Sequence, residues 1–185
     1  MNTKWLPKTL SVDIKRLRQV KWHSIGVLIA LGLMIALVQA NLRLPLRLPG
    51  WRGLYWLTPL VATRLLTSRF GAASTVSLSA AGFSLLFAVK NDPFDWFFYL
   101  VVGEFLDIAY HLGKKWRRQI WFWAIVAGLV HLLRPLTRMI VSASGVWSYG
   151  FLSNGYIYPL VTHLLFGLVA GLVGSGVVLG LKRIR

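Results

Sequence analysis

The sequence predicts an all-α membrane protein, a bundle of six transmembrane helices with both termini cytoplasmic. The 185-residue chain is 56% hydrophobic and has a mean hydropathy of +0.62, far above that of ordinary soluble domains. Its nine tryptophans and six tyrosines gather near the ends of long apolar segments, as in an interfacial aromatic belt. Its net charge of +16 falls mainly between those segments, so the expected partner is a bilayer with anionic lipids and not nucleic acid.

A bilayer core of about 30 Å needs about 20 helical residues. On this measure we expect six spans, at 24–41, 53–68, 71–90, 95–112, 119–143 and 157–181. The second is the weakest, because Arg64 interrupts it and Pro59 lies inside it. Residues 1–23 are expected to form a basic amphipathic segment on the cytoplasmic surface, and 24–185 the six-helix transmembrane domain.

The placement of lysine and arginine sets the expected orientation. Basic residues are concentrated in the first 21 residues, in the loop at 114–118 and at the C-terminus. Six spans put all three groups on one side together with Arg69, and that side is then cytoplasmic. The loop at 144–156 has no charge and falls outside. We therefore expect a multi-pass protein of the cell (inner) membrane.

The loop at 41–53 is an exception to the cytoplasmic placement of basic residues, because Arg43, Arg47 and Arg52 fall on the outer side. Snorkelling of these side chains to lipid phosphate is the simpler explanation. The alternative is an entrance that attracts an anionic or electron-rich solute.

Polar residues lie inside two of the expected spans, on each at positions i, i+3 and i+7, so that each set shares one helical face. The sets are Glu104, Asp107 and His111 in the fourth span and His131, Arg134 and Arg138 in the fifth.

Glu104 is expected near mid-membrane, where Arg134 of an antiparallel neighbour can reach it. A pair that holds two helices in register is the simplest explanation. The alternatives are a ligand site built on the same charges and a proton path or catalytic dyad. Glu-x-x-Asp-x-x-x-His offers ligand types for a hard or borderline metal but lacks the two-histidine spacing of a zincin. We expect no metal and no cofactor.

Small residues recur at four-residue steps in the first and last spans, a pattern that lets helix backbones approach closely. In the last span, packing within the bundle is favoured. In the first, packing and contact with another subunit are equally favoured. The candidate interface residues there are Gly26, Ala30, Gly32, Ala36 and Ala40.

The uncharged outer loop carries aromatic residues and Asn154 among glycines. Anchoring in the aromatic belt explains several of them. A mobile lid whose rings stack on a flat ligand, with Asn154 orienting it, explains them equally well.

Two stretches carry a family resemblance: "LPGWRGLYWLTPLVATRLLTSRFGAASTVSLSAAGFSLLF" at 48–87 and "HLLFGLVAGLVGSGVVLGLKRIR" at 163–185. The first resembles the Pro-Gly lead into the second helix and the "GAA" start of the third helix in the S components of energy-coupling-factor vitamin transporters. The second resembles the glycine-rich final helix of that family. The nearest branch is that of the thiamine-precursor permeases.

The resemblance implies a small six-helix protein that binds a vitamin or precursor on its outward side, under the loops after the first, third and fifth helices. It also implies an Ala-x-x-x-Ala stripe on the first helix that docks on a transmembrane coupling subunit driven by ATPase subunits. Ala36 and Ala40 have that form but lie near the outer end, whereas Gly26 and Ala30 are better placed for a cytoplasmic partner.

We therefore expect a substrate-binding subunit for uptake of a small vitamin-like solute, and not an enzyme. The chain has no nucleotide site, so partner subunits would supply energy. One alternative is a scaffold subunit of an energy-converting or photosynthetic complex. Another is an intramembrane hydrolase or lipid-modifying enzyme that uses Glu104, Asp107 and His111. The expected solute contacts are Glu104, His131 and Arg134 at the pocket base and Trp147, Tyr149, Asn154 and Tyr156 in its lid.

Overall fold

A computed structural model describes residues 22–42, 48–87, 94–152 and 155–184 of the chain. Every regular element in these ranges is helical, which confirms the all-α prediction. Each predicted span coincides with one helix, apart from small differences at the ends. Most of the predicted 1–23 segment lies outside the described residues. The helices are α2 (Trp22–Asn41), α3 (Gly53–Leu66), α4 (Ala72–Leu86), α5 (Asp95–Leu112), α6 (Ile120–Ala143) and α7 (Ile157–Ile184), with a 3-10 turn, η1, at Gly150–Leu152.

Two of these helices are long and apolar enough to cross a membrane, judged by length and composition: Ile120–Ala143 and Ile157–Leu181. The apolar helices Ile25–Asn41 and Ala72–Leu86 are shorter. Large apolar side chains are also exposed on the surface, among them Phe70 at 80%. The described residues thus support membrane association, while six spans and their orientation remain predictions.

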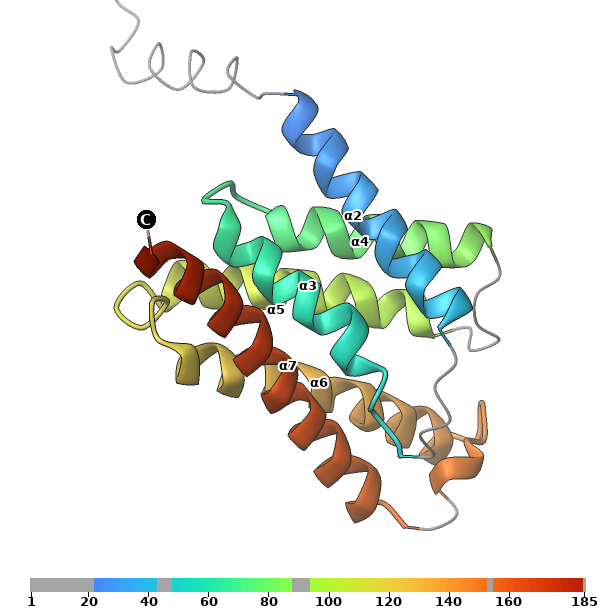
Figure 1. The fold of residues 1–185 in the computed structure, drawn as a ribbon. Helices are drawn as coiled ribbons and strands as arrows, with labels where there is room; N and C mark the ends of the chain where they lie inside the picture. Colours follow the sequence, from blue (N-terminus) through green and yellow to red (C-terminus); the bar gives the residue numbers. More distant parts are fainter. Residues whose placement is uncertain (1–21, 43–47, 88–93, 153–154, 185) are drawn as a thin grey trace, which may run out of the picture.

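Successive helices run in opposite directions, and they form two groups joined by α3 (Figure 1). In one group α4 packs against both α2 and α5, and in the other α7 packs against both α6 and α3. The loops 67–71 and 113–119 lie at one end with the C-terminus. We call this the basic end, because it carries Arg69 and the basic run at 114–118. The opposite end is called the far end.

Glycines of α7 allow it to pack tightly in the bundle. A Cβ on Gly171 would lie 2.7 Å from the Cα of Ala124 in α6. A Cβ on Gly174 would lie 2.7 Å from the carbonyl oxygen of Thr58 in α3. Backbone atoms cannot move aside as a flexible side chain can, so these glycines set the distances from α7 to α6 and α3. Packing within the bundle, favoured for this helix from the sequence, is what the structure shows.

Replacing Gly171 with alanine is therefore expected to destabilise the protein by about 1–3 kcal/mol, because the added methyl group overpacks the α6–α7 contact. Gly176 on the same helix is the matched control, since a Cβ there meets nothing within 4 Å. Its replacement with alanine should leave the thermal unfolding temperature unchanged or raise it, because alanine favours helix over glycine. Equal unfolding temperatures for the two variants would contradict this packing.

Of the five residues predicted as a subunit interface on α2, two are buried, two are exposed and Ala40 is half-buried. Gly32 and Ala36 are buried, and a Cβ on Gly32 would lie 2.6 Å from the carbonyl oxygen of Val76 in α4. These two residues therefore pack within the chain. Gly26 and Ala30 are exposed, and a Cβ on Gly26 meets nothing within 4 Å. A subunit contact at these two positions remains a prediction.

Candidate functional site

The buried carboxylate at the basic end is Asp107 of α5, and it caps another helix. Its oxygens accept hydrogen bonds from the backbone N–H groups of Ala73 (3.3 Å) and Ser74 (2.8 Å) and from the Ser74 hydroxyl (2.6 Å). These groups lie in the first turn of α4, whose N-cap position, Gly71, has no side chain to do this. Asp107 of α5 thus caps the N-terminus of the neighbouring helix α4.

Arg64 at the end of α3 completes this arrangement. Its Nε lies 3.2 Å from Asp107 Oδ1, and its Nη1 donates a hydrogen bond to the carbonyl oxygen of Arg69 at 2.7 Å. Its guanidinium also lies 3.7 Å from the centre of the Tyr110 ring. Arg64 is fully buried. Its charge is tolerated inside an apolar helix because Asp107 pairs with it. The Arg64–Asp107 pair links α3, α4 and α5 and is a structural clamp.

The predicted pair of Glu104 with Arg134 is not formed. Glu104 is exposed on α5, while Asp107 on the same helix is buried. Residues three apart lie about 60° apart around a helix of 3.6 residues per turn, and the edge of the buried face falls between these two. Glu104 therefore lies away from the other predicted contact residues.

Arg134 pairs instead with Asp95, the first residue of α5. Its Nη2 lies 2.5 Å from Asp95 Oδ1, and Arg138 Nη2 lies 3.1 Å from the same oxygen. Arg134 also lies 5.5 Å from the centre of the Phe98 ring, and Arg138 lies 5.2 Å from that of Tyr149. We call Asp95, Arg134 and Arg138 the far-end triad. It joins α5 to α6 at the far end.

Asp95 could have been found by counting residues. From the connection between α5 and α6, Asp95 lies 17 residues before Leu112, and Arg138 lies 18 after Ile120. Antiparallel helices rise equally, so equal counts place the two side chains at the same depth. Glu104 is only 8 residues before Leu112 and is too close to the basic end to reach Arg134.

A second far-end group surrounds Trp56 of α3, which is fully buried. Its ring makes edge contacts with those of Phe98, Tyr99 and His131, at centroid distances of 5.3, 5.6 and 5.5 Å. Gln39 of α2 donates a side-chain hydrogen bond to the Tyr99 hydroxyl. These rings therefore bring α3, α5 and α6 together, with α2 joined through Tyr99.

His131 holds the turn that precedes α3. Its Nε2 lies 2.9 Å from the carbonyl oxygen of Gly50, which can only accept, so Nε2 carries the proton. Gly50 has a φ of +84°, and a Cβ there would meet His163 of α7. The rings of His131 and His163 lie 4.9 Å apart. A Cβ on Gly53 would also meet the His131 ring, so only glycine fits there.

Four buried polar atoms in this region have no hydrogen-bond partner among the described residues. Native proteins pair nearly all such atoms, so an unpaired group needs an explanation. Tyr55 and Trp56 offer donors, and Gln39 offers an acceptor. His131 Nδ1 is an acceptor when the ring is neutral, because Nε2 holds the proton. The atoms are Gln39 Oε1, Tyr55 Oη, Trp56 Nε1 and His131 Nδ1.

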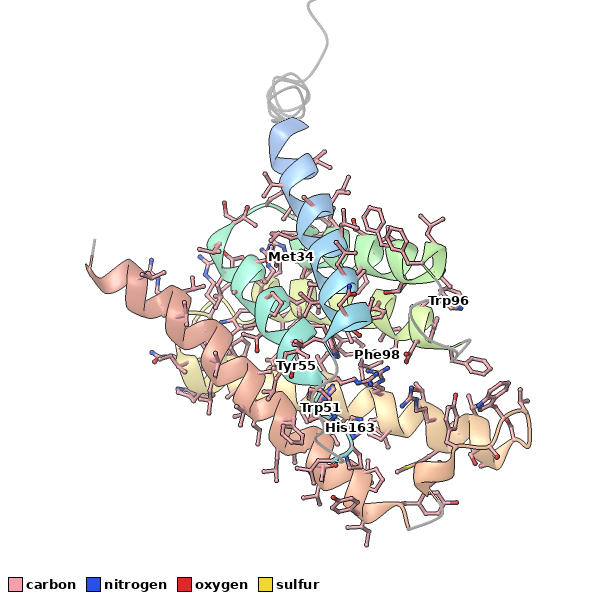
Figure 2. All side chains as sticks on the ribbon, turned by 45° about the vertical axis from the view of Figure 1, so that its right-hand side comes forward. Met34, Trp51, Tyr55, Trp96, Phe98 and His163 are labelled. Atoms are coloured by element: carbon pink, nitrogen blue, oxygen red, sulfur yellow. The ribbon has the colours of Figure 1, made fainter. Side chains whose placement is uncertain are left out.

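We call Gln39, Tyr55, Trp56 and His131 the far-end cluster. It is built from the end of α2, the start of α3 and the second half of α6. Figure 2 shows Trp51 and Tyr55 at the start of α3 and His163 on α7. Of its members, only His131 was predicted from the sequence as a contact residue. Trp56, Tyr55 and Gln39 were not predicted as contact residues. They lie near the ends of predicted helices, where anchoring in the aromatic belt explains aromatic residues equally well.

Of the predicted lid residues that the structure describes, Tyr149 alone has a contact with the far-end triad. Tyr149 is partly buried and lies against Arg138 of the far-end triad. Trp147 and Tyr156 are 45% and 57% exposed, and Asn154 lies outside the described residues. A role of these residues in a lid remains a prediction.

In the described ranges, no three histidine, aspartate or glutamate side chains lie close enough together to hold a metal ion. Comparisons with protein-family models, curated proteins and solved structures give no match for this chain.

Proposed function

We propose that this chain is a membrane-embedded substrate-binding subunit for uptake of a small vitamin-like solute, energised by partner ATPase and coupling subunits. The observation that carries the proposal is the far-end cluster, four buried hydrogen-bonding atoms that lie among aromatic rings and have no partner within the described part of the chain. Most small-molecule sites are likewise mainly apolar, with a few polar groups that fix orientation.

All six helices cross the cell (inner) membrane in this proposal, with the basic end in the cytoplasm. The alternating helix directions and the basic residues gathered at one end favour this orientation. The N-terminal end of α2 and the C-terminal end of α7 are then both cytoplasmic. The far end faces outward, so the far-end cluster lies on the side from which a nutrient arrives.

The far-end cluster offers binding without covalent chemistry. An unpaired buried polar group costs about 1–3 kcal/mol, which a solute that forms the missing hydrogen bonds recovers. The faces and edges of Trp56, Tyr99 and His131 favour a flat solute. Asp95 is already engaged by Arg134 and Arg138, so it holds helices together beside the site. These groups select a solute by shape and hydrogen bonding.

In this proposal the solute reaches the far-end cluster past the turn at 48–52. This turn is held to α6 by the hydrogen bond from His131 to Gly50. α5 and α6 also pack less extensively than α6 and α7 do. Release of the Gly50 bond would uncover His131 from the outer side. A solute would then enter between the turn and the far-end triad.

A panel of vitamins and their precursors tests this proposal through thermal stabilisation of the purified chain. One panel member is expected to raise the unfolding temperature of the wild type. The His131→Ala variant should lose most of this response, because it removes the Nδ1 acceptor and the ring beside Trp56. Glu104→Ala is the matched control, since Glu104 is exposed and away from the cluster, and it should respond as the wild type does. An equal response of both variants would contradict the assigned site.

A scaffold subunit of an energy-converting or photosynthetic complex is the second candidate. The exposed small residues Gly26 and Ala30 and the basic end favour it, since either could meet a partner chain. The chains that co-purify with the protein from its native membrane separate the two functions. ATPase subunits support the transport proposal, and redox subunits support the scaffold.

A further inference from the structure

An apolar groove lies between α2 and α3 in the half of the bundle near the basic end. Its volume is about 360 Å³. Leu28 and Thr63 are buried in it, and Val27 and Leu66 are 59% and 64% exposed at its rims. The Thr63 hydroxyl donates a hydrogen bond to the Pro59 carbonyl oxygen at 2.7 Å. The methyl group of Thr63 is then the part that offers apolar contact in the groove. The lining residues are Val27, Leu28, Leu31, Thr63, Leu66, Thr67 and Arg69.

The polar part of the groove is where α3 ends. The N–H of Arg69 donates to Thr67 Oγ1 at 3.2 Å, and its carbonyl accepts from Arg64, so the backbone of this loop is fixed. The guanidinium of Arg69 has no hydrogen bond or ion pair with the other described residues. The groove thus joins an apolar surface to one cationic side chain.

We propose that this groove binds one acyl chain of an anionic phospholipid, whose phosphate is held by Arg69. The inference rests on the membrane orientation proposed above and is independent of solute binding. In that orientation Arg69 lies just beyond the end of α3, at the level of the cytoplasmic head groups, and the groove extends from it toward the bilayer centre along Val27 and Leu31.

Charge complementarity favours a lipid of this class over a neutral one. A phosphate and a guanidinium form charge-assisted hydrogen bonds, and basic sites between helices on the cytoplasmic side select anionic head groups. The exposed Lys114, Lys115 and Arg118 at the same end add to the attraction for such lipids. The walls of the groove provide the apolar contact for the chain.

Native mass spectrometry of the purified chain tests the proposal with phosphatidylglycerol and phosphatidylethanolamine of identical acyl chains. The wild type should keep one phosphatidylglycerol with about fivefold higher occupancy, as expected for one partly exposed charge-assisted contact. Arg69→Gln should lower this occupancy to the phosphatidylethanolamine level. Arg118→Gln, which removes an exposed charge from the other loop of the basic end and does not line the groove, should lower this occupancy far less than Arg69→Gln does.

A second pair of variants tests the groove itself. Val27→Trp places an indole at the rim and should reduce occupancy by both lipids, and the exposure of Val27 allows this change without loss of the fold. Ile29→Trp is the matched control, because Ile29 is 41% exposed on the same helix but does not line the groove. Equal binding of the two lipids, or lipid binding unaffected by Val27→Trp, would overturn the proposal. So would a result in which Val27→Trp releases a co-purifying protein and leaves lipid occupancy unchanged.

Discussion

Replacement of Asp107 with alanine should destabilise the protein more than any other single change considered above. The variant leaves the Arg64 guanidinium buried without its carboxylate, and it leaves the N–H groups of Ala73 and Ser74 without an acceptor. Breaking a buried ion pair in this way costs about 3–5 kcal/mol. We expect a large fall in the SDS concentration at which the helical circular dichroism signal is lost, or a failure to accumulate in the membrane.

Two further variants separate the ion pair from the helix cap. Glu104→Ala removes an exposed carboxylate from the same helix and should change stability by less than about 0.5 kcal/mol. The double variant Arg64→Leu with Asp107→Leu removes both charges but not the need to cap α4. It should recover only part of the lost stability. Full recovery would show that Asp107 does not act as a cap, and an unaffected Asp107→Ala variant would contradict the clamp altogether.

Replacement of Asp95 with alanine should have the second largest effect. Arg134 and Arg138 then lose the carboxylate oxygen that both contact, and their like charges lie close together between α5 and α6. Because the Arg134 side chain is 9% exposed and that of Arg138 19%, we expect a loss of about 3 kcal/mol, slightly below that of a fully buried pair. The same SDS titration measures it.

The partner arginines provide the control for Asp95. Arg138→Gln keeps the shorter Arg134 contact and should cost much less than Asp95→Ala. If Arg138→Gln is as damaging as Asp95→Ala, the far-end triad is not held chiefly through Arg134. The loss of stability caused by Asp95→Asn should lie between those of Arg138→Gln and Asp95→Ala, because an amide oxygen still accepts a hydrogen bond but carries no charge.

The helices were predictable because long apolar runs leave few alternatives. The segment at 95–112 matches α5 at both ends, and Pro59 and Arg64 did not prevent α3 from forming over the expected residues. Arg64 is accommodated since it lies at the end of its helix with a buried partner. The sequence alone could not show this partner, because Arg64 and Asp107 are 43 residues apart and meet only through tertiary packing.

The polar contacts were less predictable, because they depend on helix rotation and depth. Asp107 and Glu104 differ by less than one turn, yet one is a buried clamp and the other is exposed. Hydropathy does not distinguish two carboxylates. Trp56 and Gln39 were missed for a different reason: their role follows from where α2, α3 and α6 come together. Such meeting points are set by packing, including the close contact of Gly53 with His131.

Native mass spectrometry of the chain purified gently from its own membranes tests the proposed function most directly. We predict that the wild type retains one vitamin-like small molecule, and that Glu104→Ala retains it while His131→Ala loses it. An empty wild-type chain, together with no stabilisation by any member of a vitamin panel, would contradict the assignment of the far-end cluster as a solute site.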